Sequence, residues 1–177
     1  MSVEIKIGNR IISDNHPTYF VADIAANHDG SLERAKYLIK LAKQAGADAA
    51  KFQNFAAPKI VSDYGFKALG SQQSHQASWK RSVFEVYQSA SIPFEWTYEL
   101  KETCDKVGID YFSAPYDFEA IDFLDEHMPV YKIGSGDIDW LEAIERIARK
   151  GKPVFLATGA SNIGDVQRAV HTVLAHN

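Results

Sequence analysis

Short apolar segments alternate with longer segments of helical period along most of this chain, and this alternation most constrains its fold. Five apolar segments end in small or polar residues, as buried strands do, and they cover residues 20–26, 49–55, 111–115, 130–135 and 154–159. Between them, apolar residues recur with the spacing of one helix face, as at Leu32, Ala35, Leu38, Ile39 and Ala42. Strands and helices that alternate in this way predict βαβ units, a parallel sheet and an α/β fold.

The ends of the helices are marked by residues that favour such positions. Ser31 can cap the first helix and Gly46 can end it. A later helix begins near Leu141 and is closed by Gly151. Further helices are predicted over residues 94–107, 117–127 and 163–173.

Two segments fall outside this rhythm. Residues 4–12 predict a small hairpin that turns at Gly8–Asn9. Residues 56–92 separate the second strand from its helix and are far longer than an ordinary βα loop of roughly 2–6 residues. We interpret this insertion either as a substrate-binding loop or as a structural flap with a short helix near 79–89, and the two are compatible. The chain is thus expected to form one domain over residues 1–177, with the hairpin and lead-in at 1–19 and five βα units at 20–177.

Charge and composition exclude several classes of protein. With 19 basic and 23 acidic residues the net charge is −4, so no surface for nucleic acid or an anionic membrane is expected. No apolar run approaches the roughly 18 residues that span a bilayer. Cys104 is the only cysteine, which makes an internal disulfide impossible and favours a reducing, cytoplasmic setting.

Three charged residues lie inside strands that should be apolar if both faces are buried. Asp23, Lys51 and Lys132 each stand a few residues before the end of a predicted strand. An unpaired buried charge is costly, so each must be paired or must face a wet cavity. Two ammonium groups and a carboxylate that converge there predict a site for an anion such as a phosphate or a carboxylate. A buried lysine–aspartate ion pair without a ligand is the alternative.

Neighbouring polar residues extend this candidate site. Strand alternation places Asn27 on the face of Asp23, and Gln53 on the face of Lys51. The segment Gly134–Ser135–Gly136 offers backbone N–H groups and a hydroxyl at a strand end, which suits a phosphate. No pair of histidines has the spacing of a metal site, and no P-loop or dinucleotide fingerprint is present.

Four stretches, in this order and at these separations, carry a resemblance to a known family. They are ADIAANHDG at 22–30, GADAAKFQ at 46–53, YKIGSGD at 131–137 and GKPVFLATG at 151–159. With them the chain resembles the N-terminal barrel domain of the sialic acid synthase (N-acetylneuraminate synthase) family, from the hairpin to the last residue.

The resemblance implies a TIM-type barrel that condenses phosphoenolpyruvate with an N-acetyl hexosamine aldehyde, such as N-acetylmannosamine, to a sialic acid-type nonulosonate. In that family the strand lysines hold phosphoenolpyruvate, so Lys51 and Lys132 inherit this role, and Ser135 inherits a phosphate contact. Asp23 and Asp137 stand where glutamates are usual, and the residue at position 23 is proposed to handle protons and water at the reacting centre.

The sequence also departs from the family. Two phosphate-binding hydroxyls are replaced by Ala114 and Ala157, and the adjacent Ser113 and Thr158 are the expected substitutes. We interpret this change as the mark of a subfamily with a different sugar.

A complete barrel takes about 250 residues, so this chain is expected to be part of a longer enzyme and inactive alone. The family implies a divalent metal, manganese or magnesium, that acts as a Lewis acid. Its ligands lie on later strands, so none is expected here. A homo-oligomer, as a dimer, is expected.

Two alternatives remain open. One is another condensation of phosphoenolpyruvate with an aldose, which forms a deoxyoctulosonate or deoxyheptulosonate phosphate. The other is a non-catalytic anion-binding or assembly module, which the absent strands and the alanines at 114 and 157 favour.

Overall fold

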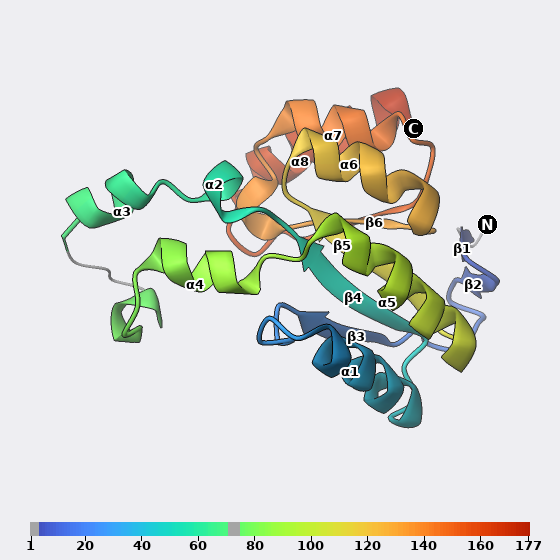
Figure 1. Cartoon of the computed structure of the whole chain (residues 1–177). Helices are drawn as coiled ribbons and strands as arrows, with labels where there is room; N and C mark the ends of the chain where they lie inside the picture. Colours follow the sequence, from blue (N-terminus) through green and yellow to red (C-terminus); the bar gives the residue numbers. More distant parts are fainter. Residues whose placement is uncertain (1–3, 71–74) are drawn as a thin grey trace.

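Five strands, each followed by a helix, form the body of the protein (Figure 1). The structure, a computed structural model, describes residues 4–70 and 75–177. The strands are β3 (Val21–Ala25), β4 (Ala49–Asn54), β5 (Asp110–Pro115), β6 (Tyr131–Ile133) and β7 (Val154–Leu156). The helices between and after them are α1 (Leu32–Gln44), α5 (Phe94–Val107), α6 (Phe118–Leu124), α7 (Leu141–Ala148) and α8 (Ile163–His176). The predicted alternation is therefore confirmed.

All pairings among these five strands are parallel, as predicted. β3, β4 and β5 form one three-stranded sheet in that order, and β6 pairs with β7 in a second sheet. β5 and β6 lie side by side without a shared ladder (Figure 1), so the single sheet expected from the sequence is two adjoining sheets. The strand predicted at 130–135 is shorter because a 3-10 turn, η3 (Ser135–Asp137), begins before its expected end.

Local sequence explains where the helices begin and end. The Ser31 side chain accepts a hydrogen bond from the backbone N–H of Arg34 and so caps α1. Gly46 follows that helix with a φ of +88°, a left-handed conformation that favours glycine. The helix predicted at 117–127 is divided into α6 and a 3-10 turn, η2 (Asp125–His127). None of the helices in the described ranges is long and apolar enough to cross a membrane.

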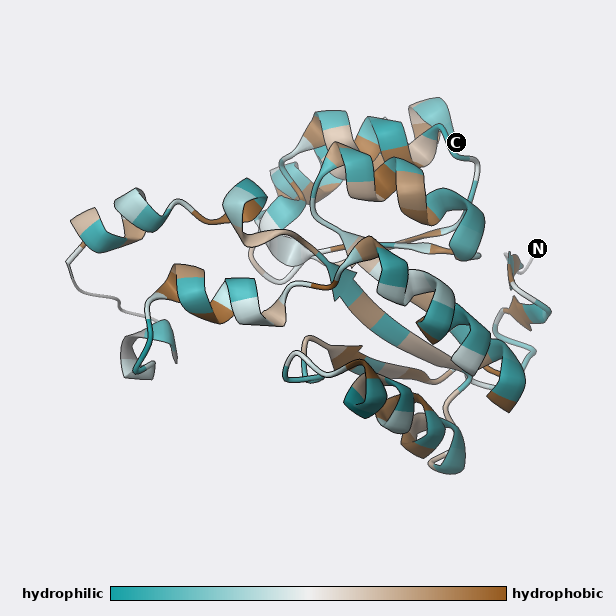
Figure 2. Cartoon of the chain, viewed as in Figure 1, coloured by the Kyte–Doolittle hydropathy of each residue, from teal (hydrophilic) through white to brown (hydrophobic). Residues whose placement is uncertain are grey.

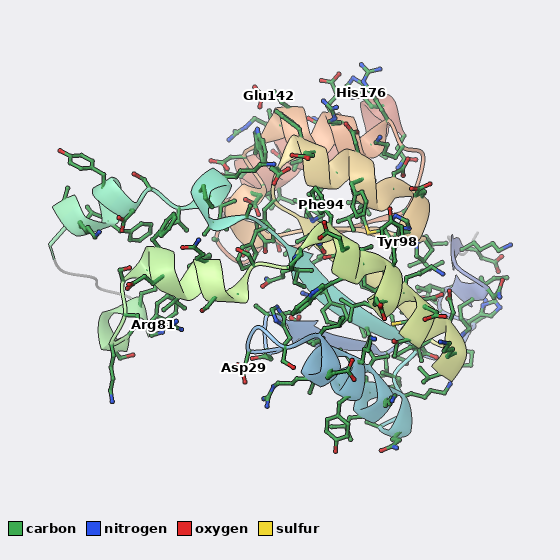
Figure 3. The ribbon with its side chains drawn as sticks, in the orientation of Figure 1. Asp29, Arg81, Phe94, Tyr98, Glu142 and His176 are labelled. Carbon is green, nitrogen blue, oxygen red and sulfur yellow. The ribbon has the colours of Figure 1, made fainter. Side chains whose placement is uncertain are left out.

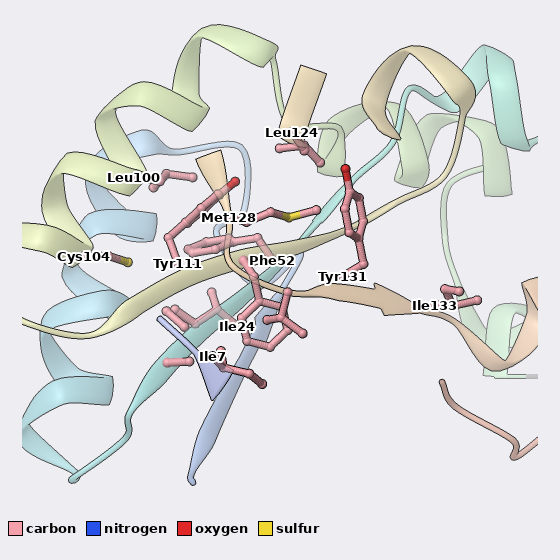
Figure 4. Close-up of a cluster of buried hydrophobic side chains, with 14 of the residues drawn as sticks. Ile7, Ile24, Phe52, Leu100, Cys104, Tyr111, Leu124, Met128, Tyr131 and Ile133 are labelled. Carbon is pink, nitrogen blue, oxygen red and sulfur yellow. The ribbon is translucent and has the colours of Figure 1, made fainter. Parts of the chain in front are cut away.

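The hydrophobic core lies between the strands and the helices that cover their outer face. Apolar faces of these helices turn toward the strands, while their polar faces look outward (Figure 2). Phe52, Tyr111 and Tyr131 are among the largest fully buried side chains, and they meet residues from α5 and α6 (Figure 4). Cys104 on α5 is also fully buried, and burial raises the pKa of its thiol to about 12, so it packs rather than reacts.

The two irregular segments are folded. β1 (Ile5–Ile7) and β2 (Arg10–Ile12) form the predicted hairpin, which turns at Gly8–Asn9. The insertion holds α2 (Ala57–Ile60), α3 (Asp63–Ala68), a 3-10 turn, η1 (His75–Ser78), and α4 (Val83–Ala90). It extends from the body as an arm (Figure 1), with α4 close to the helix expected near 79–89. Ser82 and Glu85 form a capping box at the start of α4.

Candidate active site

The three charged residues found inside the strands line one cavity of about 620 Å³, here called the inner cavity. Asp23 reaches it from β3, Lys51 from β4 and Lys132 from β6, so the predicted convergence is observed. Apolar side chains of Val21, Phe112 and Phe155 complete its strand wall, and residues from the lead-in before β3 close another side. Charges set among apolar walls act through a lower dielectric than in water, which strengthens their attraction for an anion.

Lys51 and Asp23 form an ion pair on the wall of this cavity. The Lys51 Nζ lies 2.7 Å from Asp23 Oδ1. The lysine side chain is only 9% exposed, whereas the aspartate side chain is 63% exposed. The two interpretations from the sequence, an anion site and a lysine–aspartate ion pair, are therefore compatible. The lysine is paired, and its aspartate partner faces open space.

Lys132 carries a second positive charge that no carboxylate contacts. Its ammonium group donates a hydrogen bond to the carbonyl of Ile133, at 2.7 Å, and no ion pair to it occurs among the described residues. Burial lowers the pKa of Lys132, and the positive charge of Lys51 lowers it further, while Asp23 and Asp137 act in the opposite direction. An anion between the two lysines would relieve this repulsion.

Ser135 and Asp137 lie on η3, directly after β6, and neither is part of the inner cavity wall. A Cβ on Gly134 would stand 2.7 Å from Asp137 Oδ2, so the carboxylate packs where only glycine leaves room. Burial raises the pKa of Asp137, against the attraction of Lys132. The Ser135 hydroxyl faces the loop after β7. A Cβ atom added to Gly159 in that loop would lie 3.9 Å from Ser135 Oγ.

Tyr116 contacts the site through Gln53, and the sequence analysis missed it. It follows β5, and its hydroxyl accepts a hydrogen bond of 3.1 Å from Gln53 Nε2. Burial and the nearby Asp137 raise the pKa of Tyr116 to about 12, so its hydroxyl keeps its proton at neutral pH. Its position at the carboxyl end of a strand was the available signal, but an aromatic residue there does not stand out from core residues.

Asn27 and Gln53 line a second cavity of about 610 Å³, here called the rim cavity, which lies between the ends of β3 and β4 and the insertion. The prediction that Asp23, Ala25 and Asn27 share one face by simple alternation is wrong. The β3–β4 register shifts between Asp23 and Ala25, where Ala25 has a left-handed φ of +51°. Ala25 instead pairs with Phe52, the neighbour of Lys51 on the opposite face of β4, and Ala25 and Asn27 line the rim cavity whereas Asp23 lines the inner one.

Ser113 does not take the place of the hydroxyl that Ala114 removes. It is fully buried, and its hydroxyl donates a hydrogen bond of 2.6 Å to Asn54 Oδ1. Its neighbour Phe112, opposite Lys51 in the β4–β5 register, lines the inner cavity, so strand alternation turns Ser113 to the other face. In this structure Ser113 therefore belongs to the packing of β4 against β5.

Comparison with known proteins identifies the family of this chain. The NeuB family matches residues 38–177. This chain belongs to the NeuB family. The resemblance to sialic acid synthases stated from the four sequence stretches is thereby confirmed.

Relatives of this NeuB family chain are about twice as long. An uncharacterised protein of Methanocaldococcus jannaschii is 37% identical over 175 residues, which are 98% of this chain and 47% of that protein. Human N-acetylneuraminate-9-phosphate synthase is 30% identical over 176 residues, 98% of this chain and 48% of the human protein. The chain thus spans about half the length of the curated relatives it matches.

A solved structure shares the fold. The N-acetylneuraminic acid synthetase of Leptospira borgpetersenii, crystallised in complex with citrate, superposes with a TM-score of 0.82 at 28% sequence identity. The match covers 99% of this chain and 56% of that one.

Proposed function

We propose that this NeuB family chain forms the phosphoenolpyruvate-binding part of a sialic acid-type nonulosonate synthase. The observation that carries the proposal is the convergence of Lys51, Lys132 and Asp23 on the inner cavity. Phosphoenolpyruvate carries its phosphate and its carboxylate on the same carbon, C2, and two lysines that face one cavity can neutralise both. The five βα units would belong to a TIM-type barrel whose remaining units lie beyond this chain.

The proposed reaction joins phosphoenolpyruvate to an N-acetyl hexosamine aldehyde. C3 of phosphoenolpyruvate attacks the aldehyde carbon, whose oxygen takes up a proton and becomes a hydroxyl. Water then adds at C2 and loses one proton, which leaves a hydroxyl on C2. The C–O bond to phosphate breaks as this hydroxyl gives its remaining proton to the departing phosphate, and a 2-keto acid is left. Lys51 and Lys132 would hold the anionic groups throughout, and the exposed carboxylate of Asp23 would accept the proton of the water.

The acceptor sugar would enter through the rim cavity. Gln53 lies two residues beyond Lys51 on β4, which is a rise of about 7 Å along the strand. Asn27, Gln53 and the hydroxyl of Tyr116 would contact the sugar from the strand ends, with Asp137 behind the tyrosine and Ser135 near the phosphate.

A divalent metal, manganese or magnesium, is part of this proposal for the complete protein, where it would polarise the aldehyde. Among the described residues no three His, Cys, Asp or Glu side chains converge, so these residues do not fit a metal site. We propose that its ligands come from other parts of the complete protein, and we expect no turnover from the 177-residue chain alone. A cytoplasmic homodimer is the proposed working form.

Calorimetric titration with phosphoenolpyruvate tests the binding step. The chain should bind it, and Lys132→Met should weaken the affinity at least tenfold, because a charge-assisted contact is lost. Lys106→Met, which removes an exposed lysine paired with Glu102 on α5, is the matched control and should leave the affinity unchanged. No binding to the native chain, or equal binding to the Lys132 variant, would refute the proposal.

The two alternatives are separated by other measurements. Product analysis with several acceptor sugars, run on the longer protein, distinguishes a nonulosonate from a deoxyoctulosonate or deoxyheptulosonate phosphate. A longer protein that binds phosphoenolpyruvate but converts no acceptor would favour the binding module, which the half-length match keeps open.

A further inference from the structure

A small pocket of about 190 Å³ lies among the helices that cover the strands, and it is here called the helix-side pocket. Its walls come from the end of β4, from α2 and from the first turns of α5 and α6. Most of the wall is apolar and includes Phe55, Ile92, Phe94 and Ala120. Phe94 extends from the start of α5 toward α6, where its ring stacks on Phe123 with 4.5 Å between the ring centres (Figure 3). These stacked rings fix one wall of the pocket.

The helix-side pocket is separate from the two cavities of the candidate active site. Along β4, Lys51 lines the inner cavity and Gln53 lines the rim cavity, whereas Asn54 lines the helix-side pocket. Successive side chains of a strand point to opposite faces, so Asn54 faces the helices. In the described part of the chain, the helix-side pocket shares no lining residue with the inner cavity and only Phe55 with the rim cavity. A ligand in it would therefore occupy neither site of the proposed reaction.

Asn54 brings an unsatisfied hydrogen-bond donor to this apolar wall. The residue is only 1% exposed. Its Oδ1 accepts a hydrogen bond of 2.6 Å from the hydroxyl of Ser113, but its Nδ2 has no hydrogen-bond partner among the described residues. A buried amide donor without a partner is destabilising, and buried polar groups in proteins almost always have one. The pocket thus lacks one hydrogen-bond acceptor beside Asn54.

A charged bridge lies at the solvent-facing side of the pocket. The Nζ of Lys59, on α2, is 2.6 Å from Glu119 Oε2 and 3.3 Å from Asp117 Oδ1, both at the start of α6. Asp117 Oδ1 also accepts a hydrogen bond of 2.9 Å from the backbone N–H of Ala120. These groups are already paired, and two carboxylates against one ammonium leave an excess of negative charge. The bridge therefore does not favour an anion in the pocket.

Water alone is a poor occupant of this pocket. A buried water molecule typically makes about three hydrogen bonds to protein groups. Asn54 is the only uncharged polar side chain on the wall within residues 4–70 and 75–177, and the charged side chains there are paired with one another. An occupant that buries apolar surface and offers one acceptor suits these walls better.

We propose that the helix-side pocket binds a small uncharged ring compound that carries one hydrogen-bond acceptor, a carbonyl or an ether oxygen. Phe55 and Phe94 would contact the ring, and Asn54 Nδ2 would donate to the acceptor. The size agrees, because a dry apolar cavity of about 150 Å³ holds a benzene ring, and this pocket is slightly larger. The inference is independent of the proposed function.

Acetophenone and benzoate are matched probes, because each is a benzene ring with a planar carbonyl substituent and they differ in charge. NMR titrations of the native chain follow the side-chain amide protons of Asn54. Acetophenone should bind and shift these protons downfield, as a new hydrogen bond does. Benzoate should bind at least tenfold more weakly, because its carboxylate would be buried beside Asp117 without a partner. Ethylbenzene, which lacks an acceptor, should cause no downfield shift.

Ala56→Leu tests where acetophenone binds. Ala56 is half-buried on the wall, and its extended backbone accommodates a leucine side chain, which would fill the pocket. The affinity for acetophenone should fall at least tenfold. Ala68→Leu, at an exposed position at the end of α3, is the matched control and should leave the affinity unchanged.

Four outcomes would overturn the inference. They are no shift of the Asn54 amide protons up to the solubility limit of acetophenone, equal or tighter binding of benzoate, the same downfield shift with ethylbenzene, and an unchanged affinity for acetophenone in the Ala56 variant. The first would mean that water satisfies Asn54. The first three are measured on the native chain, so they decide the question even if the Ala56 variant does not fold.

Discussion

Lys51 and Asp23 stand directly opposite each other in the parallel register of β3 and β4, with 2.7 Å between Nζ and Oδ1. The contact forms at the last regular pair before the register shift at Ala25. Lys51 is buried and Asp23 is exposed, so Asp23 balances the charge of Lys51 as long as no anion is bound to the lysine. The pair thus serves both the stability of the strand pair and the proposed binding of phosphoenolpyruvate.

Asp23→Asn should lower the free energy of unfolding by about 1–2 kcal/mol. Breaking a fully buried pair costs more, but the open side of this pair lets water reach Lys51 and reduces the penalty. Urea unfolding measures the change. Asp63→Asn, which removes an exposed pair with Lys67, is the control and should have little effect. An equal effect of the two substitutions would show that burial of Lys51 does not matter.

The same Asp23→Asn variant should bind phosphoenolpyruvate more tightly than the native chain, by roughly tenfold. Removal of the carboxylate frees the ammonium group of Lys51 and removes a repulsive charge from the inner cavity. Calorimetric titration measures this affinity. Weaker binding would mean that Asp23 positions Lys51 rather than competing with the ligand.

Binding of phosphoenolpyruvate should take up protons at alkaline pH. The pKa of Lys132 lies below the ordinary 10.5 because of burial and the nearby Lys51, so part of this lysine is neutral as the pH rises through the lowered pKa. The bound anion favours the charged form, which raises that pKa again, and affinity should therefore fall as pH rises through this window. Titrations at a series of pH values between 7 and 10.5, in two buffers of different ionisation enthalpy, measure the uptake. Lys132→Arg keeps the charge but does not titrate there, so the uptake should vanish.

In the absence of ligand, the same shift has a defined effect on folding. Between the lowered pKa and 10.5, the unfolded chain binds more protons at Lys132 than the folded chain. The contribution of Lys132 to the free energy of unfolding should therefore rise with pH across that window. A contribution that falls across this window, measured as the difference between the native chain and Lys132→Arg, would contradict the assignment.

Ser113→Ala should destabilise the fold by about 1–2 kcal/mol and leave the affinity for phosphoenolpyruvate unchanged. The substitution removes a buried hydrogen bond and leaves Asn54 Oδ1 without a partner. Ser135→Ala is the contrasting variant, since its half-buried hydroxyl should affect affinity more than stability. Urea unfolding and calorimetry on both variants test the assignment. If the Ser113 variant were fully stable but bound phosphoenolpyruvate more weakly, Ser113 would be a ligand-binding residue after all.

The 177-residue chain should self-associate at high micromolar concentration. Ile163 and Leu174 on α8 are 74% and 72% exposed, and they share a helix face with the partly exposed Val170. A contiguous apolar face of this kind promotes association in water. Light scattering over a concentration series measures it. Ile163→Glu with Leu174→Glu should give monomers, whereas His171→Glu on the polar side should not, and a stable monomer of the native chain would contradict this expectation.

The order of elements follows from the sequence alone because helix and strand periods are local properties. Local sequence patterns were enough to predict the caps of α1, the hairpin turn at Gly8–Asn9 and all five strands. The convergence of Lys51, Lys132 and Asp23 was also predictable, since a charge inside an apolar strand needs a wet cavity and parallel strands end at one edge.

Tertiary structure decided how the site is divided. The register shift at Ala25 separates Asp23 from Asn27, and pairing between β4 and β5 turns Ser113 toward Asn54. The contact of Tyr116 with Gln53 and the place of Arg81 beside the rim cavity join residues far apart in the chain. A local pattern cannot specify these features, because register, bulges and the packing of an insertion depend on which surfaces meet after the strands have paired.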